Sequence, residues 1–181
     1  MIVLFGLAGS GKGTQGKALS EKFGWKWLSV GDVIRNTGKY KEITDKGCLI
    51  PDDDVIALMN EQIAELEKAG YNIILDGYPR NEYQAKWIVD HMPEKLEGAI
   101  VLEVPKEELY NRLALRGRDD DKEKDSIDRR FEVFEQNICS ILSLFEGKNI
   151  PVQRVNGVGA IEDVTARLTN IVKQFCPEQN N

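Results

Sequence analysis

Residues 1–14 read Met-Ile-Val-Leu-Phe-Gly-Leu-Ala-Gly-Ser-Gly-Lys-Gly-Thr. The apolar run from Ile2 to Phe5 is long enough for a buried strand, and it ends at a glycine-rich turn. A helical pattern begins at Lys12. A strand, a glycine-rich turn and a helix in this order are typical of a loop that binds the phosphates of a nucleotide.

The chemistry of this loop follows from what a triphosphate needs. Glycines at positions 6, 9, 11 and 13 let the backbone turn tightly and bring bare N–H groups close to phosphate oxygens. The start of the following helix adds a partial positive charge, Lys12 is a mobile cation, and Thr14 offers a hydroxyl. The usual pattern has Ser or Thr directly after the lysine, whereas Gly13 intervenes here. The alternative is a flexible glycine turn without a ligand, which the lysine in register disfavours.

The composition is that of an ordinary globular chain. Its 181 residues suffice for one domain with a full core, and 41% are hydrophobic and 30% charged. The net charge of −6 disfavours general nucleic-acid binding, and no apolar run approaches the roughly 20 residues that span a membrane. We expect no targeting segment before the first strand. The three widely spaced cysteines, at positions 48, 139 and 176, suit a reducing cytoplasm.

Strand-like and helical patterns alternate along the chain, which predicts a parallel sheet covered by helices on both faces. The strand-like runs are residues 2–5, 27–29, 72–75, 99–104 and 152–155, and the clearest helical patterns are 15–23, 52–69, 126–146 and 161–175. Trp25, Trp27 and Trp87 are interpreted as packing residues. No apolar helix face is left over for a partner, so we expect a monomer.

A second group of chemical signals follows the third predicted strand. Residues 72–80 end in Asp-Gly-Tyr-Pro-Arg, and Asp76 at the strand end can hold Mg²⁺ through the water shell of the ion. Gly77 allows close backbone approach, Pro79 stiffens the turn, and Arg80 can bind a phosphate with two N–H groups. The alternative is a plain strand and turn with a solvated arginine.

The arginines are unevenly distributed. Five of the nine fall between Arg112 and Arg130, which in an acidic chain suggests a small anionic ligand gathered at one site. Arg116 and Arg118 flank Gly117, and the glycine is expected to end a helix and leave a mobile loop carrying two cations. Movable cations above a phosphate loop suit phosphoryl transfer, in which charge builds on the transferred group.

Taken in order, residues 6–15, 28–35, 76–80 and 155–159, with the arginines at 116, 118 and 130, resemble the nucleoside monophosphate kinases, and the adenylate kinases among them in particular. The Gly-Lys-Gly-Thr-Gln form of the loop is typical of that family. The resemblance implies a P-loop NTPase-type three-layer α/β fold with a five-stranded parallel sheet. It also implies a monophosphate-binding insert at 29–50 and a short lid at 115–125 that contains no cysteine and therefore no zinc.

The resemblance further implies a reaction, the reversible transfer of a phosphoryl group from Mg-ATP to AMP, giving two ADP. Lys12, Arg80, Arg116, Arg118 and Arg130 would be the catalytic residues. ATP would contact Gly9, Ser10, Gly11, Lys12, Gly13, Thr14, Arg116 and Gly159. AMP would contact Ser29, Val30, Arg35, Cys48, Leu49, Ile50, Gly77, Tyr78, Pro79, Arg80, Gln84, Arg118 and Arg130. Asp76 would reach Mg²⁺ through water, with no direct protein ligand to a metal.

The acceptor base stays open between two interpretations. Gln84 carries a donor and an acceptor that suit an adenine edge, and it matches the adenylate kinase pattern, which favours AMP. Val30 and Asn81 depart from that pattern, and Asn81 resembles the uridylate–cytidylate kinases. A UMP/CMP kinase is therefore the first alternative.

Other classes of nucleotide-binding protein are less well supported. A guanine-reading Asn-Lys-x-Asp motif is absent from the sequence, which disfavours a GTPase. A P-loop ATPase, or a nucleotide-binding sensor with weak activity, stays possible in principle. The choice between Arg129 and Arg130 is also open: counting from Arg118 favours Arg129, whereas the helical phase against Ile127 and Phe131 favours Arg130.

Overall fold

The computed structural model describes residues 1–117, 121 and 123–177. Five parallel strands form one sheet in the order β2-β3-β1-β4-β5. Their bounds are β1 (Ile2–Phe5), β2 (Lys26–Ser29), β3 (Ile73–Asp76), β4 (Gly98–Glu103) and β5 (Val152–Asn156). Each overlaps a run that the sequence predicted, so the predicted five-stranded parallel sheet is confirmed. The glycine-rich loop follows the central strand.

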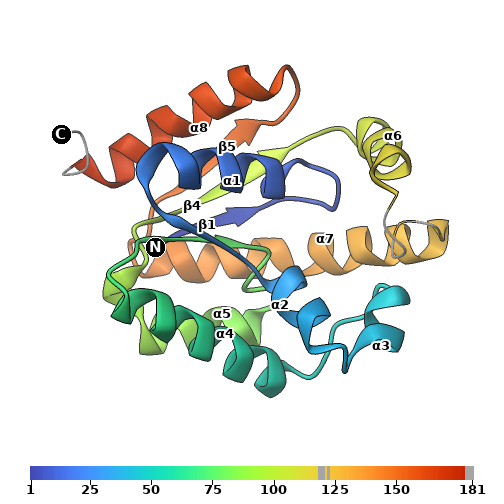
Figure 1. Ribbon diagram of the computed structural model, residues 1–181, viewed down its shortest axis with the longest axis horizontal. Helices are drawn as coiled ribbons and strands as arrows, with labels where there is room; N and C mark the ends of the chain where they lie inside the picture. The colour runs from blue at the N-terminus through green and yellow to red at the C-terminus, as the bar shows by residue number, and fades with distance from the viewer. Residues whose placement is uncertain (118–120, 122, 178–181) are drawn as a thin grey trace.

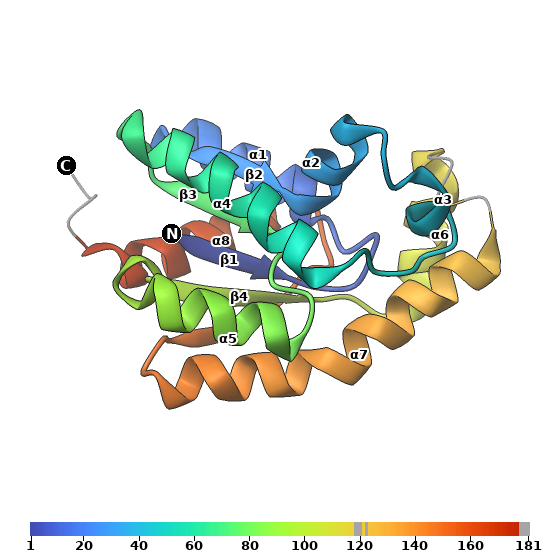
Figure 2. The ribbon, with the colours of Figure 1, turned by 90° about the horizontal axis from the view of Figure 1, so that it is seen from below.

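Helices cover both faces of the sheet (Figures 1 and 2). One face packs against α1 (Lys12–Phe23) and α8 (Ile161–Phe175). The other packs against α4 (Asp52–Lys68), α5 (Glu82–His91) and α7 (Lys124–Gly147). Alternate residues of β1 point to opposite faces of the sheet. Ile2 and Leu4 pack in the core with α1 and α8, while Val3 and Phe5 pack in the core with α4, α5 and α7. The predicted three-layer arrangement is confirmed.

The central strands are buried on both sides, and this accounts for their composition. All four residues of β1 and all four of β3 are buried. A strand covered on both faces needs a continuous apolar run rather than an alternating one, which is what residues 2–5 and 73–75 provide. Asp76 is the polar exception, and it lies at the carboxyl end of β3.

Two short helices, α2 (Val30–Thr37) and α3 (Lys41–Asp45), lie between β2 and α4, within the predicted insert. The chain after α3 passes close to the start of α7, because a Cβ atom at Gly47 would lie 2.5 Å from the carbonyl oxygen of Ser126. Helix α6 (Lys106–Arg116) follows β4 and ends at Gly117, whose φ of 67° is left-handed. Gly117 therefore ends the helix as predicted. Figure 2 shows α3, α6 and the first turns of α7 at the same end of the molecule.

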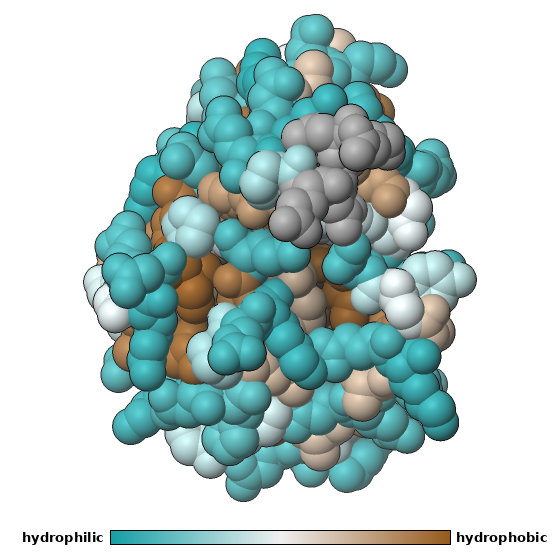
Figure 3. Space-filling model, turned by 90° about the vertical axis from the view of Figure 1, so that its left-hand side faces the viewer, coloured by the Kyte–Doolittle hydropathy of each residue, from teal (hydrophilic) through white to brown (hydrophobic). Residues whose placement is uncertain are grey.

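The opposite end of the molecule is largely hydrophilic. Figure 3 views the left-hand side of Figure 1, and polar residues dominate it, with apolar side chains visible in the gaps between them. A short 3₁₀ helix, η1 (Pro93–Lys95), precedes β4. Among the helices that the structure describes, none has both the length and the apolar character needed to cross a membrane.

Candidate active site

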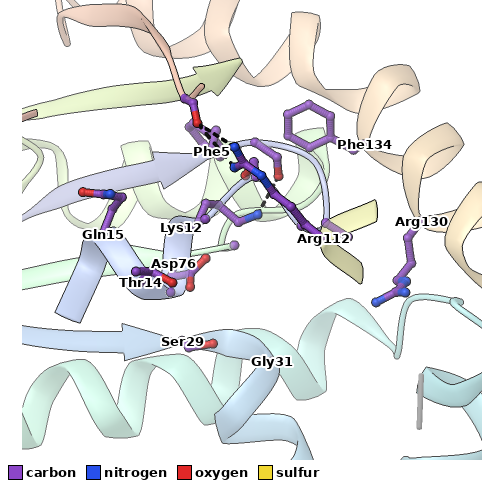
Figure 4. Close-up of a pocket in the computed structure, with 18 of the residues that line it drawn as sticks. Phe5, Lys12, Thr14, Gln15, Ser29, Gly31, Asp76, Arg112, Arg130 and Phe134 are labelled. Atoms are coloured by element: carbon purple, nitrogen blue, oxygen red, sulfur yellow. Dashed lines mark hydrogen bonds between the residues drawn. The ribbon is translucent and has the colours of Figure 1, made fainter. Parts of the chain in front are cut away.

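A single cavity of about 840 Å³ opens beyond the carboxyl ends of β1, β2 and β3. Ligands of parallel α/β sheets bind at this edge, because the loops that follow the strands converge there. The wall combines the glycine-rich loop, the insert, the turn after β3, and residues of α6 and α7 (Figure 4). Segments that are far apart in the sequence therefore meet around one space.

The glycine-rich loop needs backbone that other residues rarely adopt. Gly11 has a φ of 96° and stands at the start of α1, where no side chain caps the helix. The N–H groups of the first helical turn are therefore left to a ligand. Gly6 has no room for a side chain, because a Cβ atom there would lie 2.8 Å from the carbonyl oxygen of Leu102. Both features fit a phosphate-binding loop.

The Lys12 side chain folds back over this loop. Its Nζ donates to the carbonyl oxygens of Gly6, at 2.7 Å, and of Leu7, at 3.0 Å. Burial lowers the pKa of Lys12 to about 8, against the opposing effect of the Asp76 carboxylate. Phosphate oxygens carry full negative charge and are stronger acceptors than carbonyl groups, so a bound phosphate can draw Nζ away from the loop.

Asp76 lies next to the loop and is 8% exposed. Its Oδ2 accepts a hydrogen bond of 3.2 Å from Nε1 of Trp27. Burial raises the pKa of Asp76, while the Lys12 charge acts in the opposite direction. The interpretation of Trp27 as a packing residue is incomplete, because this side chain also lines the cavity. The residues around Trp27 in the sequence do not predict this role, because the hydrogen bond to Asp76 joins two different strands, β2 and β3.

The donor atoms at this point suit Mg²⁺. The Asp76 carboxylate and the Thr14 hydroxyl both line the cavity, and Figure 4 draws them in the same part of it, near Lys12. Hard divalent cations prefer oxygen ligands and keep several waters. Within the described ranges, no cluster of three or more His, Cys, Asp or Glu side chains could hold a metal ion alone. The residues therefore fit an ion that arrives with phosphate groups.

Two arginines line the part of the cavity wall that the insert and the turn after β3 form. Arg35 forms an ion pair with Asp32 one helical turn earlier, and its side chain is 40% exposed. Arg80 donates from Nε to the carbonyl oxygen of Gly77 at 2.9 Å. Both guanidinium groups also lie close to glycine backbone: a Cβ atom at Gly31 would be 3.2 Å from Arg35, and one at Gly77 would be 3.7 Å from Arg80. This wall is suited to a second anionic group.

A buried carboxylate, Asp121, binds two further arginines that line the cavity, Arg116 and Arg130. Asp121 accepts from Arg116 at 2.6 and 2.8 Å and from Arg130 at 2.8 Å. Its side chain is 2% exposed; burial alone would raise the pKa of Asp121, but the hydrogen bonds from the two arginines hold it below its usual value. Asp121 was not among the site residues predicted from the sequence. Arg118 lies outside the described residues.

The structure separates Arg130 from Arg129. Arg130 lines the cavity (Figure 4), whereas Arg129 donates to the carbonyl oxygen of Lys46 and to Sγ of Cys48 in the insert. The orientation follows the helical phase against Ile127 and Phe131, which are both buried. Counting along the chain from Arg118 was the poorer guide.

Most of the predicted contact residues line the cavity. They are residues 9–14, Ser29, Arg35, Cys48, Leu49, Gly77, Pro79, Arg80, Arg116, Arg130 and Gly159. Val30, Ile50, Tyr78 and Gln84 are buried and are not part of its lining. Their contacts with AMP stay predictions.

Gln84 is fully buried and bonded at both ends of its amide. Its Oε1 accepts from the backbone N–H of Arg80 at 2.9 Å, and its Nε2 donates to Oδ1 of Asp52 at 2.8 Å. Asn81 caps α5, accepting from the N–H of Gln84 at 2.9 Å, and also donates to Asp52 at 2.7 Å. Because both polar groups of Asn81 have structural partners, its resemblance to a pyrimidine-type residue has a local explanation.

A further group of residues flanks the glycine-rich loop. Arg112 donates to the carbonyl oxygen of Gly157 at 3.3 Å, drawn as dashed lines in Figure 4, and pairs with Glu108 at 2.9 Å. Leu115, with 88% of its surface exposed, and Ile161, with 54%, also line the cavity. The sequence analysis did not assign Arg112, Leu115 or Ile161 to the site. Their apolar and cationic surface suits a planar base.

Comparison with known proteins identifies the same family as the resemblance. The model of the family described as adenylate kinase matches residues 4–150. An adenylate kinase of Thermus thermophilus is 33% identical over 182 residues, covering 92% of this chain and 94% of that protein. An adenylate kinase of Mycolicibacterium vanbaalenii is 38% identical over 178 residues, covering 92% and 95%. One of Flavobacterium psychrophilum is 32% identical over 189 residues, covering 96% and 98%.

Proposed function

This chain belongs to the adenylate kinase family, and from that premise we propose that its cavity transfers the γ-phosphoryl group of ATP directly to AMP, giving two ADP. The family makes the chain a phosphotransferase acting on nucleoside monophosphates. The observation that carries the residue assignment is that the glycine-rich loop and two arginines, Arg35 and Arg80, line the same cavity. Two phosphate groups can be bound facing each other there.

The donor triphosphate lies along the glycine-rich loop in this proposal. Backbone N–H groups of residues 9–14 bind its phosphates, and Lys12 exchanges the carbonyl oxygens of Gly6 and Leu7 for the transferred group. The base lies toward Gly159 and Arg112. Because Lys12 can follow the phosphoryl group as it moves, it stabilises the charge throughout the transfer.

The acceptor phosphate lies between Arg35 and Arg80. One of its oxygens attacks the γ-phosphorus of ATP while the bond from that phosphorus to the β–γ bridging oxygen breaks, so the leaving group is ADP. No covalent enzyme intermediate and no dedicated general base are required, because the attacking oxygen is already anionic. Positioning and positive charge carry the catalysis.

Arg116 and Arg130 face the space between the two phosphates, and Arg118 is proposed to join them. Asp121 holds the first two side by side, so their mutual repulsion is offset before any nucleotide binds. Incoming phosphate oxygens then meet an ordered pair of cations. Asp76 and Thr14 are the residues that would hold Mg²⁺, which when bound neutralises part of the phosphate charge.

The identity of the acceptor base is tested by a coupled assay of ADP formation with ATP and a panel of AMP, UMP and CMP. We expect AMP to give the highest kcat/KM, because the chain belongs to the adenylate kinase family. A clear preference for UMP or CMP would overturn that assignment. A rate of ADP formation that does not depend on the added monophosphate would indicate an ATPase. Nucleotide binding without turnover would indicate a sensor.

We also propose an insert, a lid, an oligomeric state and a cellular location for this chain. Residues 29–50 act as the monophosphate-binding insert and residues 115–125 as a short lid without zinc. The chain works as a monomer in the cytoplasm, without nucleic acid or membrane partners. The net charge of −6 and the free thiols of Cys48, Cys139 and Cys176 support this assignment.

A further inference from the structure

We propose that Trp27 is a positioning residue of this site: its indole N–H fixes the rotation of the Asp76 carboxylate, so that the second carboxylate oxygen is presented to the water shell of Mg²⁺. The inference rests on the proposed function, because it assigns Trp27 to the metal that accompanies ATP. It adds to that function a residue that acts on the metal through Asp76.

The hydrogen bond between Trp27 and Asp76 is the first observation. Nε1 of the indole donates to Oδ2 at 3.2 Å, across the two neighbouring strands β2 and β3. Among the residues described, no other group donates to this carboxylate, so Oδ1 keeps its lone pairs for a water molecule. Asp76 lines the cavity, and a carboxylate with one oxygen held by a fixed donor has a defined orientation there.

The second observation is that the indole itself is held in place. It lies flat against helix α1, and a Cβ atom at Gly16 would be 2.3 Å from its Cδ1 and 2.6 Å from its Nε1. On the same helix, Lys17 places Nζ 5.0 Å from the ring centroid. Glycine stabilises a helix less than alanine does. Gly16 is therefore explained by the space that the ring occupies.

These contacts link the rotation of Asp76 to the glycine-rich helix. The χ2 torsion of an aspartate is broad, so without a donor at Oδ2 the carboxylate can turn away from the metal position. Groups that orient a metal-binding carboxylate change metal affinity by about 10–100-fold when they are removed. Trp27 reaches the ion only through Asp76 and water, so we expect the lower end of that range.

Two variants of Trp27 separate the hydrogen bond from the packing. Trp27→Phe keeps an aromatic ring but removes the N–H donor. Trp27→His is smaller than Phe, yet its Nε2 occupies the same place in the five-membered ring as the indole Nε1, and the Asp76 carboxylate favours the tautomer that is protonated there. If Trp27 acts only by packing, the His variant should lose more of the Mg-ATP affinity than the Phe variant. If Trp27 positions Asp76, the Phe variant should lose more.

The measurement is calorimetric titration with ATP and with Mg-ATP, which needs no turnover. We expect Trp27→Phe to lower the ratio of Mg-ATP affinity to ATP affinity about tenfold, with ATP affinity unchanged, and Trp27→His to stay within about threefold of the original ratio. The Mg²⁺ concentration that gives half-maximal kcat should rise in parallel. Equal losses in the two variants, or an unchanged ratio in Trp27→Phe, would overturn the proposal.

A third variant leaves Trp27 itself intact. Gly16→Ala places a methyl group where the indole lies, so it should displace the ring and lower the same affinity ratio. Thermal unfolding of all three variants identifies any that fail to fold, and a folded Gly16→Ala protein with a normal ratio also contradicts the proposal. If the original protein phosphorylates no monophosphate, the proposed function fails, whereas the calorimetric ratio still tests Trp27 separately.

Discussion

The two walls of the cavity are built in different ways. The donor wall, which we propose for ATP, is one continuous segment, residues 9–14, and it includes Lys12; the acceptor wall is the one that we propose for the monophosphate. The acceptor wall takes Arg35 from α2, Cys48 from the segment after α3, and Arg80 from the turn after β3. The donor wall is therefore a local structure, whereas the acceptor wall exists only when distant segments pack together.

The environments of the cations differ in the same sense. Lys12 is half-buried beside the glycine-rich loop, with Nζ bonded to the carbonyl oxygens of Gly6 and Leu7, and burial lowers its pKa. Arg35 is 40% exposed and forms a surface ion pair with Asp32, an interaction type worth about 0–1 kcal/mol. The donor wall is thus preformed. On the acceptor wall, a ligand can replace the ion pair of Arg35 with Asp32 at a small cost in free energy.

The largest expected effect is on the donor wall. Lys12→Met removes the mobile charge and should lower kcat on the order of 10²–10³-fold, as loss of a group that stabilises transition-state charge does. The fold should be retained, because methionine fills the same space without a buried charge. A coupled assay of ADP formation and thermal unfolding measure the two quantities. Near-normal turnover in a folded Lys12→Met protein would show that the assignment of Lys12 is wrong.

A smaller effect is expected on the acceptor wall. Arg80→Ala removes charged hydrogen bonds to the acceptor phosphate, each worth about 1.5–3 kcal/mol, so KM for AMP should rise about 10–100-fold. KM for ATP should change little, because the donor wall is separate. Arg154→Ala is the matched control, since Arg154 is exposed, pairs with Glu103 and lies outside this cavity. Equal changes in both KM values would remove the distinction between the walls.

The pH dependence should also differ between the walls. Because burial lowers the pKa of Lys12 to about 8, the free protein loses this charge as the pH rises through that value. The kcat/KM for ATP should then fall, approaching about tenfold per pH unit. Arginine does not titrate in this range, so kcat/KM for AMP at saturating ATP should stay level. Parallel pH profiles for the two substrates would contradict the assignment.

The smallest expected effect concerns stability rather than activity. The Tyr78 hydroxyl is buried and has no hydrogen-bond partner within the described part of the chain. Burial also raises the pKa of Tyr78. An unsatisfied buried polar group costs about 1–3 kcal/mol, so Tyr78→Phe should raise the free energy of unfolding by about 1 kcal/mol. Tyr71→Phe, at an exposed ring, should leave the free energy unchanged, and destabilisation by Tyr78→Phe would show that the hydroxyl has a partner.

Local features of the chain were predictable from sequence because their causes are local. The run from Ile2 to Phe5, the glycine-rich loop and the helix start at Lys12 depend on neighbouring residues only. The same holds for the end of α6 at Gly117 and for the phase that turns Arg130 inward. Periodicity and backbone preference act over one or two turns, and a sequence displays both directly.

Contacts between distant segments were not predictable in this way. The bond from Trp27 to Asp76 depends on the pairing of β2 with β3, and the pairing of Asp121 with both Arg116 and Arg130 depends on how α6 and α7 approach each other. The bond from Nε2 of Gln84 to Asp52 joins the starts of α5 and α4, and no spacing rule reveals it. Each of these contacts requires segments to pack before it exists.

The sequence by itself determined the fold class and the phosphate loop, because short-range patterns encode strands, helices and tight turns, and most of the contact residues that it predicted line the cavity. Only the tertiary structure decided the strand order, the orientation of the Asp76 carboxylate and the clustering of arginines around Asp121. The physical reason is that hydrogen bonds and charge pairs act over a few ångströms. Chain segments that are distant in sequence come within that range only when the core packs.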